Sequence, residues 1–84
     1  MVNEFQDQVV LITGAAGGIG AATAKLFAVD GARLALLDRD EDGLAVVAEE
    51  VRSRGAGEVL LLPVDQTNGR SVSSAIDEIT SILG

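Results

Sequence analysis

The sequence predicts an α/β fold with a three-stranded parallel sheet and three helices, because strand-like and helix-like segments alternate three times along it. Short apolar runs, typical of buried strands, begin near residues 9, 34 and 59. Each run is followed by a segment whose apolar residues recur at helical spacing. Right-handed crossovers then place the strands in the order 3-2-1, which is half of a doubly wound nucleotide-binding sheet. We expect residues 1–84 to form this single βαβαβα unit.

The first predicted strand is Val9–Thr13, a short apolar run with a polar lead-in, which favours a fully buried strand. The helix after it is expected to begin near Gly17 and Gly18. It ends at Asp30 and Gly31, where glycine suits the left-handed position after a helix. The spacing predicts that one face of this helix is formed by Ile19, Ala22, Thr23, Leu26 and Phe27.

The second predicted strand is Leu34–Leu37, and Asp38 ends it. Asp40 is the expected N-cap of the second helix, because its side chain can accept a hydrogen bond from a free backbone amide. The apolar residues of that helix repeat at helical spacing and are Leu44, Val47, Ala48 and Val51.

The third predicted strand is Val59–Val64, and it carries Pro63 near its end. Proline has no amide hydrogen for a sheet ladder, so this strand is expected at an edge of the sheet. Either Thr67 or Asn68 then caps the third helix. Its expected apolar face is formed by Val72, Ala75, Ile76, Ile79, Ile82 and Leu83.

Composition and charge exclude several classes of function. Thirteen acidic residues against six basic ones give a net charge of −7, which disfavours nucleic-acid binding and attachment to anionic membranes. The chain has no cysteine, so we expect no disulfide, no metal site and a cytoplasmic setting. The polar N-terminus is unlike a signal peptide, and no apolar run is long enough to span a bilayer. Lys25, Arg33 and Arg70 are expected to be surface charges.

The most informative segment is the glycine-rich turn TGAAGGIG at residues 13–20, which stands between a predicted strand and a predicted helix. In this context such a turn predicts a site for the pyrophosphate of a dinucleotide. The first glycine permits the tight turn, the second lets backbone approach phosphate, and the third lets the helix pack closely. The free amides and the positive end of the helix dipole face the anion. The predicted phosphate-binding residues are Gly14, Ala16, Gly17, Gly18, Ile19 and Gly20.

Acidic residues are predicted to bind the adenosine part of the dinucleotide. Asp38 follows the glycines by about twenty residues, where a carboxylate can accept hydrogen bonds from the ribose; the alternative is a cap residue before the helix. A carboxylate here repels a 2′-phosphate, so NAD is favoured over NADP, although Arg39 could pair with that phosphate. Asp65 is expected to bind the adenine edge, with Gln66 flanking the ring, or else to be a turn carboxylate.

The segment TGAAGGIG resembles the TGxxxGxG coenzyme motif of short-chain dehydrogenases/reductases, through Thr13, Gly14, Gly18 and Gly20. LLDRDEDGL is similar to that family's second strand and turn, and VDQTN is similar to its adenine-side segment. The resemblance extends from about residue 7 to residue 84. It implies the N-terminal, coenzyme-binding half of a Rossmann-type oxidoreductase domain.

The resemblance also implies that chemistry needs further residues. Members of the family continue into a fourth strand, a catalytic Ser and a Tyr-x-x-x-Lys pair. This chain has no tyrosine, so no catalytic residue is assigned. Three hypotheses stay open: a module that binds NAD(H), an enzyme piece that needs the rest of a longer chain, and a structural half-domain without ligand.

The resemblance implies a position for the first strand as well. In the complete fold this strand is central and its free edge pairs with the fourth strand. Here the edge Val9–Ile12 would present unpaired apolar backbone, which favours association. We therefore expect a homo-oligomer with a six-stranded sheet, 3-2-1-1′-2′-3′, in which the direction of the central pairing is left open.

Overall fold

The computed structural model describes residues 5–65 and 67–84, and it has the predicted βαβαβα order. Three parallel strands form one sheet in the order β1-β2-β3. Their bounds are β1 Val9–Thr13, β2 Arg33–Asp38 and β3 Val59–Pro63. The helices are α1 Gly18–Val29, α2 Glu41–Ser53 and α3 Gly69–Leu83. The predicted fold class and strand order are thus confirmed, and the strand that ends in Pro63 lies at an edge of the sheet.

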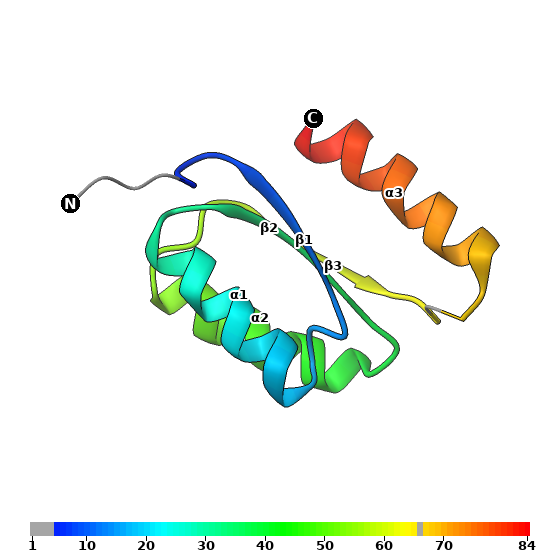
Figure 1. Ribbon diagram of the computed structural model, residues 1–84, viewed down its shortest axis with the longest axis horizontal. Helices are drawn as coiled ribbons and strands as arrows, with labels where there is room; N and C mark the ends of the chain where they lie inside the picture. Colours follow the sequence, from blue (N-terminus) through cyan, green and yellow to red (C-terminus); the bar gives the residue numbers. More distant parts are fainter. Residues whose placement is uncertain (1–4, 66) are drawn as a thin grey trace.

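The elements form three layers (Figure 1). Helices α1 and α2 cover one face of the sheet, and α3 covers the other. The shared face of α1 and α2 follows from right-handed connections between consecutive parallel strands. The carboxyl ends of the strands, and the loops that follow them, therefore meet at the same edge of the sheet. Among the described residues no helix combines enough length and apolar character to cross a bilayer.

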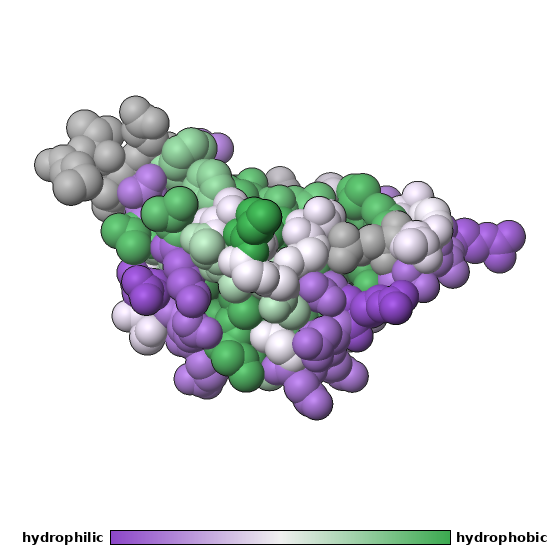
Figure 2. Space-filling view, turned by 60° about the horizontal axis from the view of Figure 1, so that its bottom comes forward, coloured by the Kyte–Doolittle hydropathy of each residue, from purple (hydrophilic) through white to green (hydrophobic). Residues whose placement is uncertain are grey.

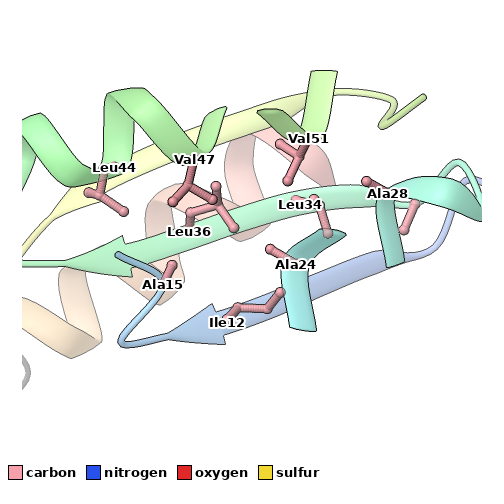
Figure 3. Packing of buried hydrophobic residues seen from close by; sticks show 10 residues of the cluster. Ile12, Ala15, Ala24, Ala28, Leu34, Leu36, Leu44, Val47 and Val51 are labelled. Atoms are coloured by element: carbon pink, nitrogen blue, oxygen red, sulfur yellow. The ribbon is translucent and has the colours of Figure 1, made fainter. Parts of the chain in front are cut away.

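The core is aliphatic and is centred on β2. Leu34 and Leu36 point from β2 toward α1 and α2, where the predicted apolar face of α2 is buried with Leu44, Val47 and Val51 (Figure 3). On the opposite face, Leu37 packs with the buried side of α3, including Ile79. A strand that is buried on both faces is expected to be continuously apolar, as β2 is from residues 34 to 37.

The predicted burial of three other elements needs correction. Helix α1 contacts the sheet through Ala24 and Ala28, whereas Ile19 and Leu26 are 87% and 73% exposed. Small side chains let this helix lie close to the sheet, and the larger ones consequently face outward. Strand β1 was expected to be fully buried, but it is an edge strand and Leu11 is exposed. Helix α3 also leaves Ile76 and Ile82 exposed.

The residues predicted to cap or end the helices are found at the helix ends. Asp40 caps α2 by accepting from the Gly43 amide at 3.0 Å. Of the two predicted caps of α3, the structure selects Asn68, whose side-chain oxygen accepts from two backbone amides. Helix α1 has no side-chain cap at Gly17. Gly31 follows α1 with φ +77°, a conformation that glycine adopts without strain.

Two of the predicted surface charges have structural partners. Arg33 donates hydrogen bonds from Nε to the Asp7 carbonyl at 3.0 Å and from a terminal nitrogen to the Leu83 carbonyl at 2.8 Å. It thereby ties the start of β2 to the end of α3. Lys25 of α1 pairs with Glu50 of α2 at 2.6 Å. Arg70 is exposed, as expected.

The buried centre of β2 provides a test of the core. Leu36→Ala removes a fully buried side chain, so we expect the free energy of unfolding to fall by about 2–5 kcal/mol. Urea denaturation followed by circular dichroism measures this loss. The control Val46→Ala alters an exposed residue of α2 and should change stability by less than about 0.5 kcal/mol. Equal effects of the two substitutions would contradict this description of the core.

Candidate functional site

The candidate site is the glycine turn between β1 and α1, at the carboxyl edge of the sheet. Gly14 has φ +63°, so the chain leaves β1 through a left-handed turn, as predicted for this glycine. The Gly17 amide donates to the Gly14 carbonyl at 3.0 Å and closes the turn. The Ala15 amide donates to the Leu37 carbonyl at 3.0 Å, which anchors the turn on β2.

The start of α1 lies directly against this turn. A Cβ atom at Gly20 would collide with the Gly14 carbonyl and stand 3.0 Å from the Ala15 Cα. The close approach that the third glycine was predicted to allow is therefore to the turn itself. At Gly18, by contrast, an added Cβ would meet no atom within 4 Å in the described structure.

The first turn of α1 leaves backbone donors free for a ligand. The first amides of a helix have no acceptor within the helix; in α1 these belong to Gly18, Ile19 and Gly20. The first intrahelical bond at this end runs from the Ala21 amide to the Gly17 carbonyl at 2.8 Å. These free donors, with the positive end of the helix dipole, suit an anion.

Asp38 joins the end of β2 to the glycine turn. Its Oδ2 accepts from the Ala16 amide at 3.1 Å, and its Oδ1 accepts from the Asp40 amide at 3.0 Å. An ionised carboxylate offers further lone pairs on both oxygens. Asp38 can therefore hold the turn and still accept hydrogen bonds from a hydroxyl group that approaches the carboxyl edge of the sheet.

Arg39 and Asp65 face each other across the ends of β2 and β3. A terminal nitrogen of Arg39 lies 4.0 Å from Asp65 Oδ2, and both side chains are exposed. Asp65 Oδ1 also accepts from the Thr67 hydroxyl at 2.6 Å and from the Thr67 amide at 2.9 Å. Asp65 therefore acts as a turn carboxylate, which is one of the two roles that the sequence left open for it. Gln66, predicted to flank the adenine ring, lies outside the described residues.

Hydrogen bonds from Thr67 lower the pKa of Asp65 below its ordinary value of 3.8, because they stabilise the ionised carboxylate. The side-chain bond has the largest effect, the backbone bond follows, and Arg39 adds a smaller electrostatic contribution. The negative charge at this position is therefore maintained in moderately acidic solution.

Sequence reasoning missed one residue that shapes the site, Gly43 in the first turn of α2. A Cβ atom at this position would stand 2.8 Å from the Ala16 Cβ and 2.5 Å from Asp40 Oδ2. Glycine here lets α2 approach the glycine turn. The sequence did carry one signal for this contact. Glycine is intrinsically unfavourable inside a helix, so its presence in the predicted second helix indicates close packing at that position.

The fold and the position of the turn define a Rossmann-type α/β unit, and comparison with known proteins identifies its family. A family model described as short chain dehydrogenase matches residues 8–84. The chain belongs to the short-chain dehydrogenase/reductase family, which confirms the resemblance seen in the glycine motif.

Individual relatives support the same assignment. The 11-beta-hydroxysteroid dehydrogenase-like 2 of Arabidopsis thaliana is 46% identical over 77 residues, covering 92% of this chain and 25% of that protein. A 2,5-dichloro-2,5-cyclohexadiene-1,4-diol dehydrogenase of Sphingobium indicum is 38% identical over 84 residues, covering 100% of this chain and 33% of that protein.

Solved structures share the fold. NAD+-bound xylitol dehydrogenase superposes with a TM-score of 0.91 at 34% identity, covering 96% of this chain and 31% of the other. The L-sorbose reductase of Gluconobacter frateurii, complexed with NADPH and L-sorbose, gives 0.89 at 30% identity, covering 98% and 31%. The chain thus spans about a quarter to a third of the length of these relatives.

Two glycines in the first turn of α1, Gly18 and Gly20, should differ in their effect on stability when each is replaced by alanine. Gly20→Ala forces the helix away from the Gly14 carbonyl, and we expect it to cost about 1–3 kcal/mol of stability. Gly18→Ala meets open space and replaces glycine by a better helix former, so stability should be unchanged or slightly higher. Thermal unfolding of the two variants measures the difference, and similar melting temperatures would refute the close approach.

The Asp65–Thr67 contact predicts a pH effect of known sign. Thr67→Val removes the hydroxyl donor, so the pKa of Asp65 should rise toward its ordinary value, whereas Thr67→Ser should preserve the lowered pKa. A carboxyl group whose pKa is lower in the folded state stabilises the fold above its unfolded pKa. That contribution is lost as the pH falls through the folded pKa. NMR titration of the Asp65 carboxyl carbon tests this, and an unchanged pKa in Thr67→Val would contradict it.

Proposed function

We propose that residues 1–84 act as one coenzyme-binding unit that holds the adenosine diphosphate part of NAD(H). The observation that carries this proposal is the arrangement at the carboxyl edge, where Asp38 is hydrogen-bonded to the same turn that precedes the uncapped start of α1. The pyrophosphate would lie against the free amides of Gly18, Ile19 and Gly20. Gly14, Ala16 and Gly17 would shape the turn beneath it.

The adenosine part would lie along the ends of β2 and β3. Asp38 would accept hydrogen bonds from the ribose hydroxyls with the lone pairs that Ala16 and Asp40 leave free. Asp65 would lie near the adenine edge, and Gln66 is assigned to the ring on the sequence alone. The exposure of Arg39 and Asp65 supports this placement, since both side chains are accessible to a ligand.

NAD is the proposed coenzyme, with NADP as the weaker ligand. The Asp38 carboxylate would repel a 2′-phosphate, while Arg39 is held near Asp65 at 4.0 Å. Structural neighbours include one bound to NAD+ and one complexed with NADPH, so family membership is compatible with either coenzyme. The preference proposed here rests on the charge of Asp38.

The unit would bind coenzyme without performing hydride transfer by itself. The 84 residues contain neither tyrosine nor histidine, and Lys25 is engaged with Glu50. Family membership supports an oxidoreductase role only where further residues supply a proton donor and a substrate pocket. The cysteine-free sequence is compatible with the cytoplasmic setting that forms part of this proposal.

The competing proposal is a structural half-domain that associates with itself and binds no ligand. Within the described residues the outer edge of β1 has no partner strand, and such an edge, where it stays unpaired, promotes association whether or not coenzyme binds. Calorimetric titration with NAD+ separates the two proposals. Absence of both heat and thermal stabilisation at saturating coenzyme would refute the coenzyme-binding unit.

The coenzyme preference provides the sharper test. Asp38→Asn removes the charge and retains a side-chain acceptor, so we expect the NAD+/NADP+ affinity ratio to fall about tenfold, or about 1.4 kcal/mol. Titration of one variant with both coenzymes cancels any general loss of stability. The control Asp42→Asn removes an exposed carboxylate in the first turn of α2 and should leave the ratio unchanged. An unchanged ratio in Asp38→Asn would overturn the assigned role.

A further inference from the structure

The side chains of Asp38 and Arg39, neighbours at the end of β2, are held toward different strands. Asp38 Oδ2 accepts from the Ala16 amide at 3.1 Å, which directs this carboxylate toward the glycine turn that follows β1. A terminal nitrogen of Arg39 lies 4.0 Å from Asp65 Oδ2, in the segment that follows β3. Because β2 lies between β1 and β3, the negative and the positive charge are held on opposite sides of this strand end.

The backbone places Asp65 beside Arg39. The Val64 amide donates to the Asp38 carbonyl at 3.1 Å, and this bond joins the two residues that precede the charged pair. The Asn68 amide donates to the Asp65 carbonyl at 3.0 Å and closes the turn after β3. The position of Asp65 next to Arg39 is therefore set by the sheet and the turn, and the exposed ion pair is not needed to create it.

Thr67 fixes the carboxylate of Asp65. Its hydroxyl and its amide donate to Asp65 Oδ1 at 2.6 Å and 2.9 Å, and the other oxygen, Oδ2, is the one that lies near Arg39. The same hydrogen bonds lower the pKa of this carboxyl group and keep it ionised. Asp65 thus presents an oriented negative charge to the guanidinium of Arg39.

The other charges that follow β2 directly in the chain are negative. Residues 34–51 contain a single basic residue, Arg39. The acidic residues at the end of β2 and the start of α2 are Asp38, Asp40, Glu41 and Asp42. Hydrophilic residues occupy the right of Figure 2, the side on which β2 and β3 end in Figure 1. Within this segment only the side chain of Arg39 could attract a phosphate group.

We propose that Asp65 is a specificity-determining residue, which disfavours a coenzyme with a 2′-phosphate by holding Arg39 away from the ribose. This inference rests on the proposed function, because that proposal places the ribose at Asp38. A 2′-phosphate there would meet the Asp38 carboxylate, and Arg39 could compensate only by leaving Asp65. A free 2′-hydroxyl requires no such rearrangement, since Asp38 accepts its hydrogen bond directly. The ion pair therefore weakens one coenzyme and not the other.

The NADP+/NAD+ affinity ratio tests this role. Asp65→Asn removes the charge that holds Arg39, and we expect calorimetric titration to show a rise of the ratio by about two- to fivefold, the size typical of an exposed ion pair. Loss of a contact to adenine would weaken both coenzymes alike and cancels in the ratio. The control Asp77→Asn makes the same change of charge on the exposed side of α3 and should leave the ratio unchanged.

A double-mutant cycle separates release of Arg39 from simple charge repulsion. In an Arg39→Gln background, Asp65→Asn should no longer change the ratio, because no guanidinium remains to be released. An equal rise in both backgrounds would mean that Asp65 acts by its own charge alone and would overturn the proposal, as would an unchanged ratio in the single variant. Thr67→Val loosens the Asp65 carboxylate and should give a smaller rise, whereas Thr67→Ser should give none.

A measurement without coenzyme distinguishes this inference from the proposed function. Arg39→Gln should raise the pKa of Asp65 in an NMR titration, because the guanidinium helps to stabilise the ionised carboxylate. An unchanged pKa would overturn the ion pair, whether or not coenzyme binds. A chain that binds neither NAD+ nor NADP+ would refute the proposed function and this inference with it. Normal binding of NAD+ with a failed double-mutant cycle would refute the role of Asp65 alone.

Discussion

The close contact between the glycine turn and its surroundings is the constraint on which the site depends. The turn is held from three sides: by β2 through the Leu37 carbonyl, by Asp38 through the Ala16 amide, and by α1 through the approach at Gly20. No flexible side chain mediates the approach of α1, because glycine leaves only backbone there. The direction in which α1 begins is therefore fixed by backbone packing, and with it the direction of its free amides.

The same turn shows how one carboxylate can hold the structure and stay available for the ribose contact that we propose. Asp38 lies at the last position of β2, where the strand ends and its side chain reaches the neighbouring turn. Two backbone donors fix its orientation. An oriented carboxylate loses little conformational entropy when a hydroxyl group binds to it, so the scaffold contributes to affinity before any ligand arrives.

The sequence predicted the element order, the helix caps and the face of α2, because each depends on local chemistry. It did not predict the buried face of α1. That helix is apolar on several sides, so helical spacing alone could not show that Ala24 and Ala28, and not the larger Ile19 and Leu26, meet the sheet. The close approach of α2 to Ala16 at Gly43, where an added Cβ would have no room, and the two hydrogen bonds of Arg33 join residues far apart in the chain. Such contacts follow from the assembled fold and have no local signature.

Arg33 has a consequence for the two ends of the chain. Its guanidinium holds a carbonyl that precedes β1 by sequence and another in the last residue of α3, respectively 26 and 50 positions away from it. Local opening of the turn before β1, or of the last turn of α3, thus removes one of the two acceptors that keep this side chain in place. A protease cut in the N-terminal turn would accordingly loosen the last turn of α3, and the two ends should lose protection from solvent exchange together.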